Sequence, residues 1–200
     1  MLKRIILFSF LILLSAASIT QAQRFHGGIL AGLSTSQVDG DHLSGFNKAG
    51  FKGGGLVNRK FGEKISLQFE IEFIQKGSRK PLNDNNEYFL MRLSYIEVPL
   101  LFNYYVGKKW NLEAGVAFAT LLSAYEEDQT GEVLNAPEFN QNDYLVCIGA
   151  NYFFTPQLYF NVRYSYSITT IRTKDEYYDY YYFVGGQYNK VLAFSLGYIF

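Results

Sequence analysis

Large apolar residues alternate with small or polar residues along most of the chain after about position 25. Segment 158–166 follows this period of two over its whole length, and segment 110–122 follows it except at Thr120. In the last segment every second position holds a large apolar side chain: Leu192, Phe194, Leu196, Tyr198 and Phe200. Alternation of this length is typical of β-strands with two chemically different faces. The pattern therefore predicts an all-β protein.

The chain can be divided into eight such segments, joined by connections of two kinds. The predicted strands are 26–36, 49–61, 65–76, 89–105, 110–123, 143–154, 158–167 and 190–200. Tight turns are predicted at 61–64, 106–109 and 155–157, and long polar loops at 37–48, 77–88, 124–142 and 168–189. Short turns at one end and long loops at the other are typical of an up-and-down barrel of the outer-membrane type.

The beginning of the chain has a different pattern. Lys3 and Arg4 precede an almost unbroken apolar run, and small and polar residues follow it up to Ala22. This order is typical of a secretory signal peptide, with cleavage expected after Ala22. The alternative is an N-terminal membrane anchor, because the apolar stretch is almost long enough to span a bilayer. We expect residues 1–22 to be the signal peptide and residues 23–200 to form the folded domain.

The amino-acid composition narrows the choice of structural class and of partner. The chain has 17 Tyr, 18 Phe and 18 Gly but only 4 Pro, which favours strands that pack on a curved surface. Its 18 basic and 18 acidic residues balance, so nothing indicates a nucleic-acid partner. Cys147 is the only cysteine and cannot form an internal disulfide. After the first segment no apolar run approaches the twenty residues that a membrane helix needs.

A soluble sandwich or lipocalin-like barrel is the alternative architecture, and it would bury the large apolar side chains inside. The export signal, the four long loops and a last strand that stays apolar up to Phe200 favour the membrane instead. Unpaired backbone groups in hydrocarbon cost several kcal/mol each, so the first and eighth strands must pair. We predict an eight-stranded antiparallel up-and-down transmembrane β-barrel in the bacterial outer membrane, with short periplasmic turns and long extracellular loops. Aromatic residues near strand ends suit its interfacial girdles: Tyr104, Tyr105, Trp110, Tyr144, Tyr152 and Phe154.

The charged residues on the inward face form the first candidate site: Glu70, Glu72, Glu97, Glu113 and Arg163. Eight strands leave an interior that side chains just fill. Buried carboxylates need partners, and Arg163 together with Lys52 can satisfy some of them. We therefore predict a packed polar plug that fixes the shape of the barrel. The alternative is a narrow ion path, which steady conductance in a planar bilayer would reveal.

A tyrosine-rich stretch in the last long loop forms the second candidate site: Tyr177, Tyr178, Tyr180, Tyr181 and Tyr182. Tyrosines interleaved with acidic residues can stack on sugars or contact a protein partner. The alternative is that they extend strands seven and eight beyond the membrane as a hairpin. Removal of residues 175–183 should leave the barrel folded, and an unchanged partner profile would then count against a binding role.

A membrane-embedded hydrolase acting on lipid or peptide is the second functional hypothesis. It needs a base and an oriented nucleophile within reach of each other. His26 and His42 are predicted at opposite membrane faces, and His42 lies near Asp39, Asp41 and Ser44. Solvation of the loop explains this cluster better, so we predict no enzymatic activity. We also expect no cofactor and no metal, because no calcium-loop spacing, zinc motif or phosphate-binding loop is present.

Four stretches of the chain share a further likeness: GILAGLSTS at 28–36, LQFEIEFIQKG at 67–77, YIEVPLL at 95–101 and NLEAG at 111–115. They resemble the outer-membrane β-barrel domain family of Bacteroidetes that includes PorT-like proteins, and the third stretch is the most specific. The resemblance implies an outer-membrane barrel without an agreed activity, and PorT-like members are associated with protein secretion across the outer membrane. Within the third stretch, Pro99 removes a ladder donor and is expected to need a bulge or a bend.

The expected function is thus an integral outer-membrane barrel with a structural, binding or assembly role through its extracellular loops. A hydrolase and a PorT-like accessory to secretion are the alternatives. The expected partners are outer-membrane lipid and an extracellular or periplasmic protein or glycan, without nucleic acid.

Overall fold

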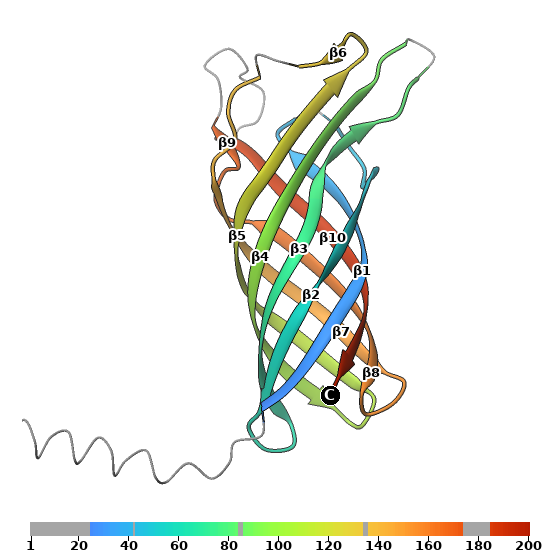
Figure 1. Cartoon of the computed structure of the whole chain (residues 1–200), viewed down its shortest axis with the longest axis vertical. Helices are drawn as coiled ribbons and strands as arrows, with labels where there is room; N and C mark the ends of the chain where they lie inside the picture. Colours follow the sequence, from blue (N-terminus) through green and yellow to red (C-terminus); the bar gives the residue numbers. More distant parts are fainter. Residues whose placement is uncertain (1–24, 42, 84–85, 134–135, 174–184) are drawn as a thin grey trace, which may run out of the picture.

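The computed structural model describes residues 25–41, 43–83, 86–133, 136–173 and 185–200. Its long strands are β1 (Phe25–Asp39), β2 (Lys48–Lys60), β3 (Ile65–Lys80), β4 (Phe89–Val106), β5 (Trp110–Asp128), β7 (Asn142–Phe153), β8 (Leu158–Ser167) and β10 (Gly186–Ile199). Two short strands, β6 (Gly131–Glu132) and β9 (Arg172–Thr173), lie in the loops (Figure 1). No described segment is a helix long and apolar enough to cross a membrane.

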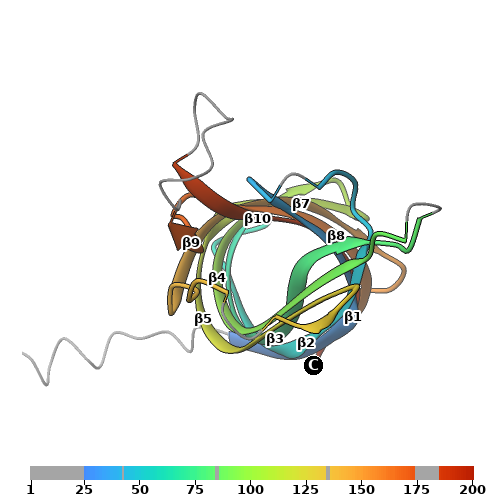
Figure 2. The same cartoon turned by 90° about the horizontal axis from the view of Figure 1, so that it is seen from above.

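The long strands form one closed ring. Their order is β1-β2-β3-β4-β5-β7-β8-β10, and β10 also pairs with β1, from Gly28 opposite Ile199 to Asp39 opposite Tyr188. Figure 2 shows the ring from above. All its pairings are antiparallel, and closure leaves no strand edge exposed to lipid. The prediction of an eight-stranded antiparallel up-and-down barrel is confirmed.

The two faces of each strand have the distribution expected of a membrane barrel. On β3, the polar residues Ser66, Gln68 and Glu70 are buried in the lumen, while Leu67 and Phe69 between them are exposed on the outer surface. The other long strands repeat the alternation, and seven of the eight carry exposed large apolar side chains, whereas the outward side chains of β8 are half-buried. A soluble barrel would have the opposite distribution, because water would face the outer surface. The outer surface therefore suits hydrocarbon.

The strands extend farther toward the loops than the alternation indicates. β3 continues to Lys80 and β5 to Asp128, beyond the predicted ends at residues 76 and 123. Lys80 is paired with Phe89 of β4, and Phe89 with Asp128. Both faces of these extensions are polar or mixed, so the period of two disappears although the backbone ladder continues. The extensions rise above the ring at the end opposite the short turns (Figure 1).

The one shift of register between described ring strands does not lie at Pro99. Phe69 is opposite Leu100 and Glu72 is opposite Glu97, so the β3–β4 register is the same on both sides of the proline and no bulge lies there. The β3–β4 ladder is instead interrupted at Val98 and Pro99. The shift occurs between β4 and β5, where Ser94 is opposite Ser123 but Tyr95 is opposite Leu121. Leu122 is the extra residue of this β-bulge. The bulge changes which residues of β5 face inward beyond it.

Candidate functional site

Arg163 lies at the centre of the lumen, projecting inward from the middle of β8. Its terminal nitrogens donate to both carboxylate oxygens of Glu70 on β3, at 2.7 and 2.8 Å, and its Nε donates to Glu113 on β5 at 2.6 Å. β8 and β3 lie on opposite sides of the ring. The Arg163–Glu70 pair therefore crosses the full width of the lumen. A planar guanidinium suits two such carboxylates because it presents its donors as a rigid fork.

We call the buried charged side chains around Arg163, Glu70 and Glu113 the ionic layer. Two lysines extend this layer toward the loop end. Lys52 on β2 lies 3.1 Å from Glu72, and Lys76 on β3 lies 2.5 Å from Glu97. Asp143 of β7 is 4.0 Å from the Lys76 ammonium and accepts hydrogen bonds from Ser167 and Asn189. Ion pairs so far from water stabilise only when each partner is present, because a single buried charge is costly.

Neutral polar side chains surround the carboxylates toward the turn end. Asn151 and Asn161 both donate to Glu113 at 3.0 Å, and Gln68 donates to Glu70 at 2.6 Å. Asn58 in turn donates to Gln68 at 3.0 Å. These amides supply donors where the described lumen has more carboxylates than cations. Each buried carboxylate oxygen of Glu70 and Glu113 thus has a hydrogen-bond donor.

An apolar layer covers the ionic layer on the loop side. It contains side chains from several strands and from the loop before β9: Val38, Met91, Leu93, Ile171 and Val191. Phe139 packs against this cluster from the loop between β6 and β7. Buried polar side chains, among them Ser36, Lys48 and Ser78, lie beside these apolar residues on the same side of the lumen. Together these side chains fill the loop-side part of the lumen, as expected for a ring of eight strands.

All five inward charged residues named from the sequence lie buried in the lumen. Glu70, Glu72 and Glu113 gather around Arg163, with Glu72 at 3.8 Å, whereas Glu97 belongs to a neighbouring pair with Lys76. Sequence reasoning missed Lys76 and Asp143. Lys76 could have been found, because it continues the even-numbered inward face of β3. Asp143 is the second residue of β7, so almost no alternation precedes it.

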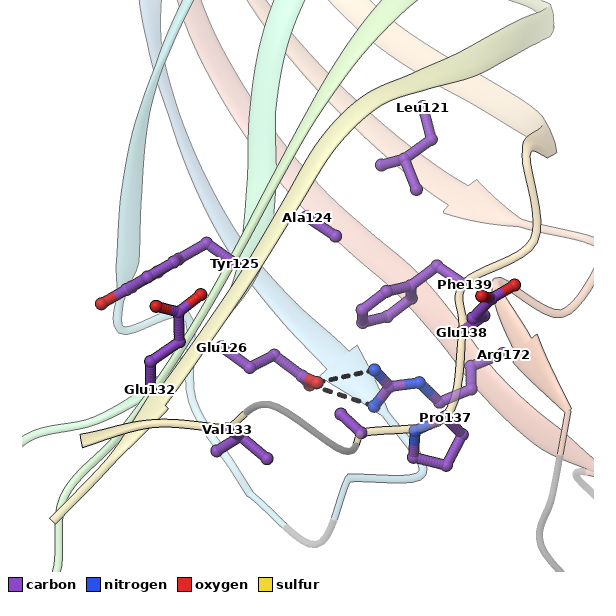
Figure 3. A pocket seen from close by; sticks show the side chains of 11 residues that line it. Leu121, Ala124, Tyr125, Glu126, Glu132, Val133, Pro137, Glu138, Phe139 and Arg172 are labelled. Atoms are coloured by element: carbon purple, nitrogen blue, oxygen red, sulfur yellow. Dashed lines mark hydrogen bonds and ion pairs between the residues drawn. The ribbon is translucent and has the colours of Figure 1, made fainter. Parts of the chain in front are cut away.

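A pocket of about 310 Å³ lies at the loop end, between β5, the β6 hairpin, segment 136–139 and β9 (Figure 3). Arg172 grips both carboxylate oxygens of Glu126, at 3.0 and 2.6 Å, and its guanidinium lies 3.7 Å from the centre of the Phe139 ring. Glu132 and Glu138 add two further carboxylates to the lining. The pocket is thus acidic, with aromatic and aliphatic walls.

Sequence reasoning also missed the Glu126–Arg172 pair, and the bulge explains why. Before Leu122 the odd-numbered residues of β5, such as Glu113 and Ala117, face inward. After it Glu126, an even-numbered residue, is buried against Arg172. A reading based on strict alternation places Glu126 on the wrong face. Arg172 lies in a two-residue strand that carries no periodic signal.

The remaining predicted sites lie wholly or partly outside the described residues. The five tyrosines of 177–182 and His42 belong to segments that the structure does not describe. Near His42, Asp39 is bound to Lys190 at 2.8 Å and Asp41 accepts from the Leu43 amide at 2.9 Å. Within the described ranges, no three His, Cys, Asp or Glu residues gather in a way that could hold a metal ion.

Comparison with known proteins identifies the family. A family model described as outer membrane protein beta-barrel domain matches residues 20–173. Among solved structures, the chain is similar to Ail, the attachment invasion locus protein of Yersinia pestis, in complex with the heparin analogue sucrose octasulfate. That alignment has 12% identity and a TM-score of 0.52, and covers 88% of this chain and 99% of Ail. Neisserial surface protein A aligns at 14% identity with a TM-score of 0.55, covering 87% of this chain and 97% of that protein.

At such low identity these two likenesses show the fold alone. No curated protein sequence matches the chain. The family match, the closed ring and the apolar outer surface together place the protein in the bacterial outer membrane. The family model spans well over half of the sequence. The chain therefore belongs to the outer membrane protein beta-barrel domain family.

Proposed function

We propose that this protein acts through the surface of its extracellular loops, and that its barrel is a closed scaffold that does not conduct. The observation that carries this proposal is the Arg163–Glu70 pair, which joins opposite strands through the centre of the lumen. An eight-stranded ring leaves an interior that side chains just fill. With the axis occupied and an apolar layer above it, the loop end is the surface left for recognition.

Charge favours one class of partner over another. The segments between the long strands at the loop end, 40–47, 81–88, 129–141 and 168–185, contain eight acidic residues and only two basic ones, Arg172 and Lys174. The Arg172 guanidinium is already held by Glu126. A polyanion such as the sucrose octasulfate found with Ail would meet repulsion here. We infer that the loops take a neutral glycan or a protein surface with exposed cations.

Planar-bilayer recording tests the closed lumen. We expect no steady conductance from the wild-type protein, because the Arg163–Glu70 pair crosses the lumen and side chains fill the space around it. Arg163→Ser, which shortens the side chain that crosses the lumen, serves as the sensitised variant. Steady, pore-like conductance from the wild type would overturn the scaffold proposal.

Loop deletion tests the recognition surface. A variant lacking residues 175–183 should migrate as a folded barrel on unheated gels and lose binding on a glycan and protein array. A variant lacking residues 83–87 is the matched control, since it shortens a different loop. Sucrose octasulfate should bind neither the wild type nor the variants. An unchanged array profile after removal of 175–183 would count against the tyrosine-rich stretch as the contact surface.

A secretion accessory is the second candidate function. It is supported by the YIEVPLL stretch at 95–101, which resembles PorT-like proteins of Bacteroidetes. In that case, removing the gene from its host should abolish the appearance of specific proteins in the medium while leaving them in the periplasm. An unchanged set of secreted proteins would exclude this role and leave the loop-surface function in place.

We also propose that the chain is not an enzyme and that residues 1–22 are removed on export. His42→Ala should leave any hydrolytic activity of intact cells unchanged, since the acidic groups near it have other partners. Loss of such an activity would revive the hydrolase hypothesis.

N-terminal sequencing tests the removal of residues 1–22. The sequence of protein taken from outer membranes should begin at Gln23, whereas a sequence that begins at Met1 would indicate an anchor.

A further inference from the structure

The two ends of the barrel have opposite charge. At the turn end, five basic residues lie on or beside the β2–β3 and β4–β5 turns, together with a single acidic residue, Glu63. We call these five the basic rim: Arg59, Lys60, Lys64, Lys108 and Lys109. The opposite end carries the acidic loops. This asymmetry is not a requirement of the fold, because turns of this kind accept many polar residues.

The basic rim is continuous because its two turns are in contact. The Tyr105 amide beside the β4–β5 turn donates to the Lys64 carbonyl in the β2–β3 turn at 2.8 Å. Lys109 in turn accepts from the Phe153 amide at 2.8 Å, next to the β7–β8 turn. In the described part of the chain no carboxylate forms an ion pair with any of the five cations. Their charges are therefore not compensated from within the barrel.

Aromatic rings hold the basic rim at the depth of the membrane interface. The Arg59 guanidinium lies 4.6 Å from the centre of the Phe61 ring and 5.7 Å from that of Phe25. The Lys109 ammonium lies 6.0 Å from the Tyr152 ring centre. Phe25, Phe61 and Trp110 are exposed on the outer surface here. Such aromatic girdles lie at the level of the lipid headgroups.

One residue of the expected girdle does not belong to it. Tyr105 faces the mouth of the lumen, where its hydroxyl lies 3.5 Å from Ser66 Oγ and its ring lies 6.1 Å from that of Phe153. The Lys60 ammonium is 5.1 Å from the Tyr105 ring centre. Lys60 is thereby drawn toward the lumen mouth, whereas Lys64, Lys108 and Lys109 are exposed on the turns.

We propose that the basic rim binds the phosphate headgroups of anionic phospholipids in the leaflet that faces the periplasm. Charge complementarity and depth both point to this ligand: uncompensated cations lie at headgroup level beside rings that contact the acyl region. Lysine and arginine near an anionic membrane surface each favour contact by a few-fold, and the effect weakens with salt. The proposal goes beyond the loop function and does not depend on it.

The chain contains its own reporter for this contact. Trp110 is the only tryptophan, it follows Lys108 and Lys109 directly, and it is 52% exposed on the lipid side. Protein from outer membranes would be reconstituted in phosphatidylcholine vesicles that contain a fixed fraction of brominated phosphatidylglycerol or brominated phosphatidylcholine. Bromine quenches tryptophan on contact, so the difference in quenching measures which lipid is enriched around the rim.

We expect about fivefold enrichment of phosphatidylglycerol at low salt, falling toward none in about 0.5 M salt. The variant Lys64→Gln/Lys108→Gln/Lys109→Gln should lose the preference. The matched control, Arg79→Gln/Lys80→Gln/Arg92→Gln, removes three positive charges at the loop end and should keep it. A gel-shift assay shows that each variant is folded.

Three results would overturn the proposal. Equal quenching by the two brominated lipids would mean that the rim does not select charge. A preference that survives in the Lys64/Lys108/Lys109 variant would assign the selection to other residues. Loss of the preference on adding millimolar inorganic phosphate, at ionic strength matched with chloride, would show that the rim takes free phosphate instead of a lipid headgroup.

Discussion

The lumen and the loop-end pocket both contain an arginine that grips a glutamate with two hydrogen bonds, yet the two pairs have different surroundings. Arg163 binds Glu70 and also Glu113, and its side chain is 2% exposed. Arg172 binds Glu126 alone, and its side chain is 10% exposed at the edge of an open pocket. Similar ion pairs therefore have different consequences. In the lumen a charge that loses its partner has no route to water, whereas in the loop-end pocket water can replace the lost partner.

The largest expected effect comes from Arg163→Met. Removing the guanidinium leaves the carboxylates of Glu70 and Glu113 buried without their cation, so the free energy of unfolding should fall by about 3–5 kcal/mol. Urea titration in lipid vesicles, followed by Trp110 fluorescence, measures the loss. Adding Glu70→Gln and Glu113→Gln should recover part of it, because neutral amides no longer need the charge. A loss below about 1 kcal/mol would mean that the lumen pair behaves like a surface pair.

Packing in the lumen gives the next largest effect. A Cβ added at Gly197 would come within 2.1 Å of the Tyr159 ring, which lies directly across from it on β8. Because Tyr159 is itself buried, Gly197→Ala should cost about 1–3 kcal/mol in the same urea titration. Gly55→Ala is the matched control, since its Cβ would find only the Gly28 carbonyl at 3.8 Å. Equal losses for the two variants would contradict close packing around Tyr159.

A smaller effect is expected when the Arg172–Glu126 pair of the loop-end pocket is broken. Arg172→Met should lower the free energy of unfolding by about 1–2 kcal/mol, because Glu126 can turn toward water. The loss should be local, with faster hydrogen exchange at the amides of Asn140 and Ile171, which bond across this region. Arg172→Lys keeps the charge but not the bidentate contact and should show an intermediate effect. If Arg172→Met destabilised the barrel as much as Arg163→Met, the contrast between the two sites would be wrong.

The smallest effect is expected at the solvent-exposed Lys80–Glu87 pair, which joins the end of β3 to the loop that follows it. Lys80 and Asn83 donate hydrogen bonds to Glu87, at 2.7 and 2.8 Å, and hold the pKa of its carboxyl below the usual value. Lys80→Gln should raise this pKa toward the ordinary value without a measurable change in unfolding at neutral pH. A carboxyl whose pKa is lowered by folding stabilises the folded protein at pH values above its unfolded-state pKa. That stabilisation is lost as the pH falls through its folded-state pKa. NMR titration of Glu87 tests this, and an unchanged pKa would mean that Asn83 alone causes the shift.

The sequence predicts the ring and its two faces because one physical constraint, apolar outside and polar inside, repeats at every second residue. That constraint placed Glu70, Glu113 and Arg163 inward without any structure. It could not say that Arg163 reaches Glu70 across the lumen, because this depends on the stagger of strands that are distant in sequence. The Leu122 bulge reverses the alternation and hides Glu126, and the paired extensions beyond Lys76 lack a lipid face and hence a pattern.

Pairing of β1 with β10 has a consequence for the life of the chain before it reaches its membrane. The partners Gly28 and Ile199 are far apart in the sequence, so the ring cannot close until β10 has been made. Contacts between such distant segments form slowly, and unpaired strands invite association with other chains. Until the barrel closes, the segments of β1 and β10 are therefore the two parts of the chain with unpaired edges that other chains could join.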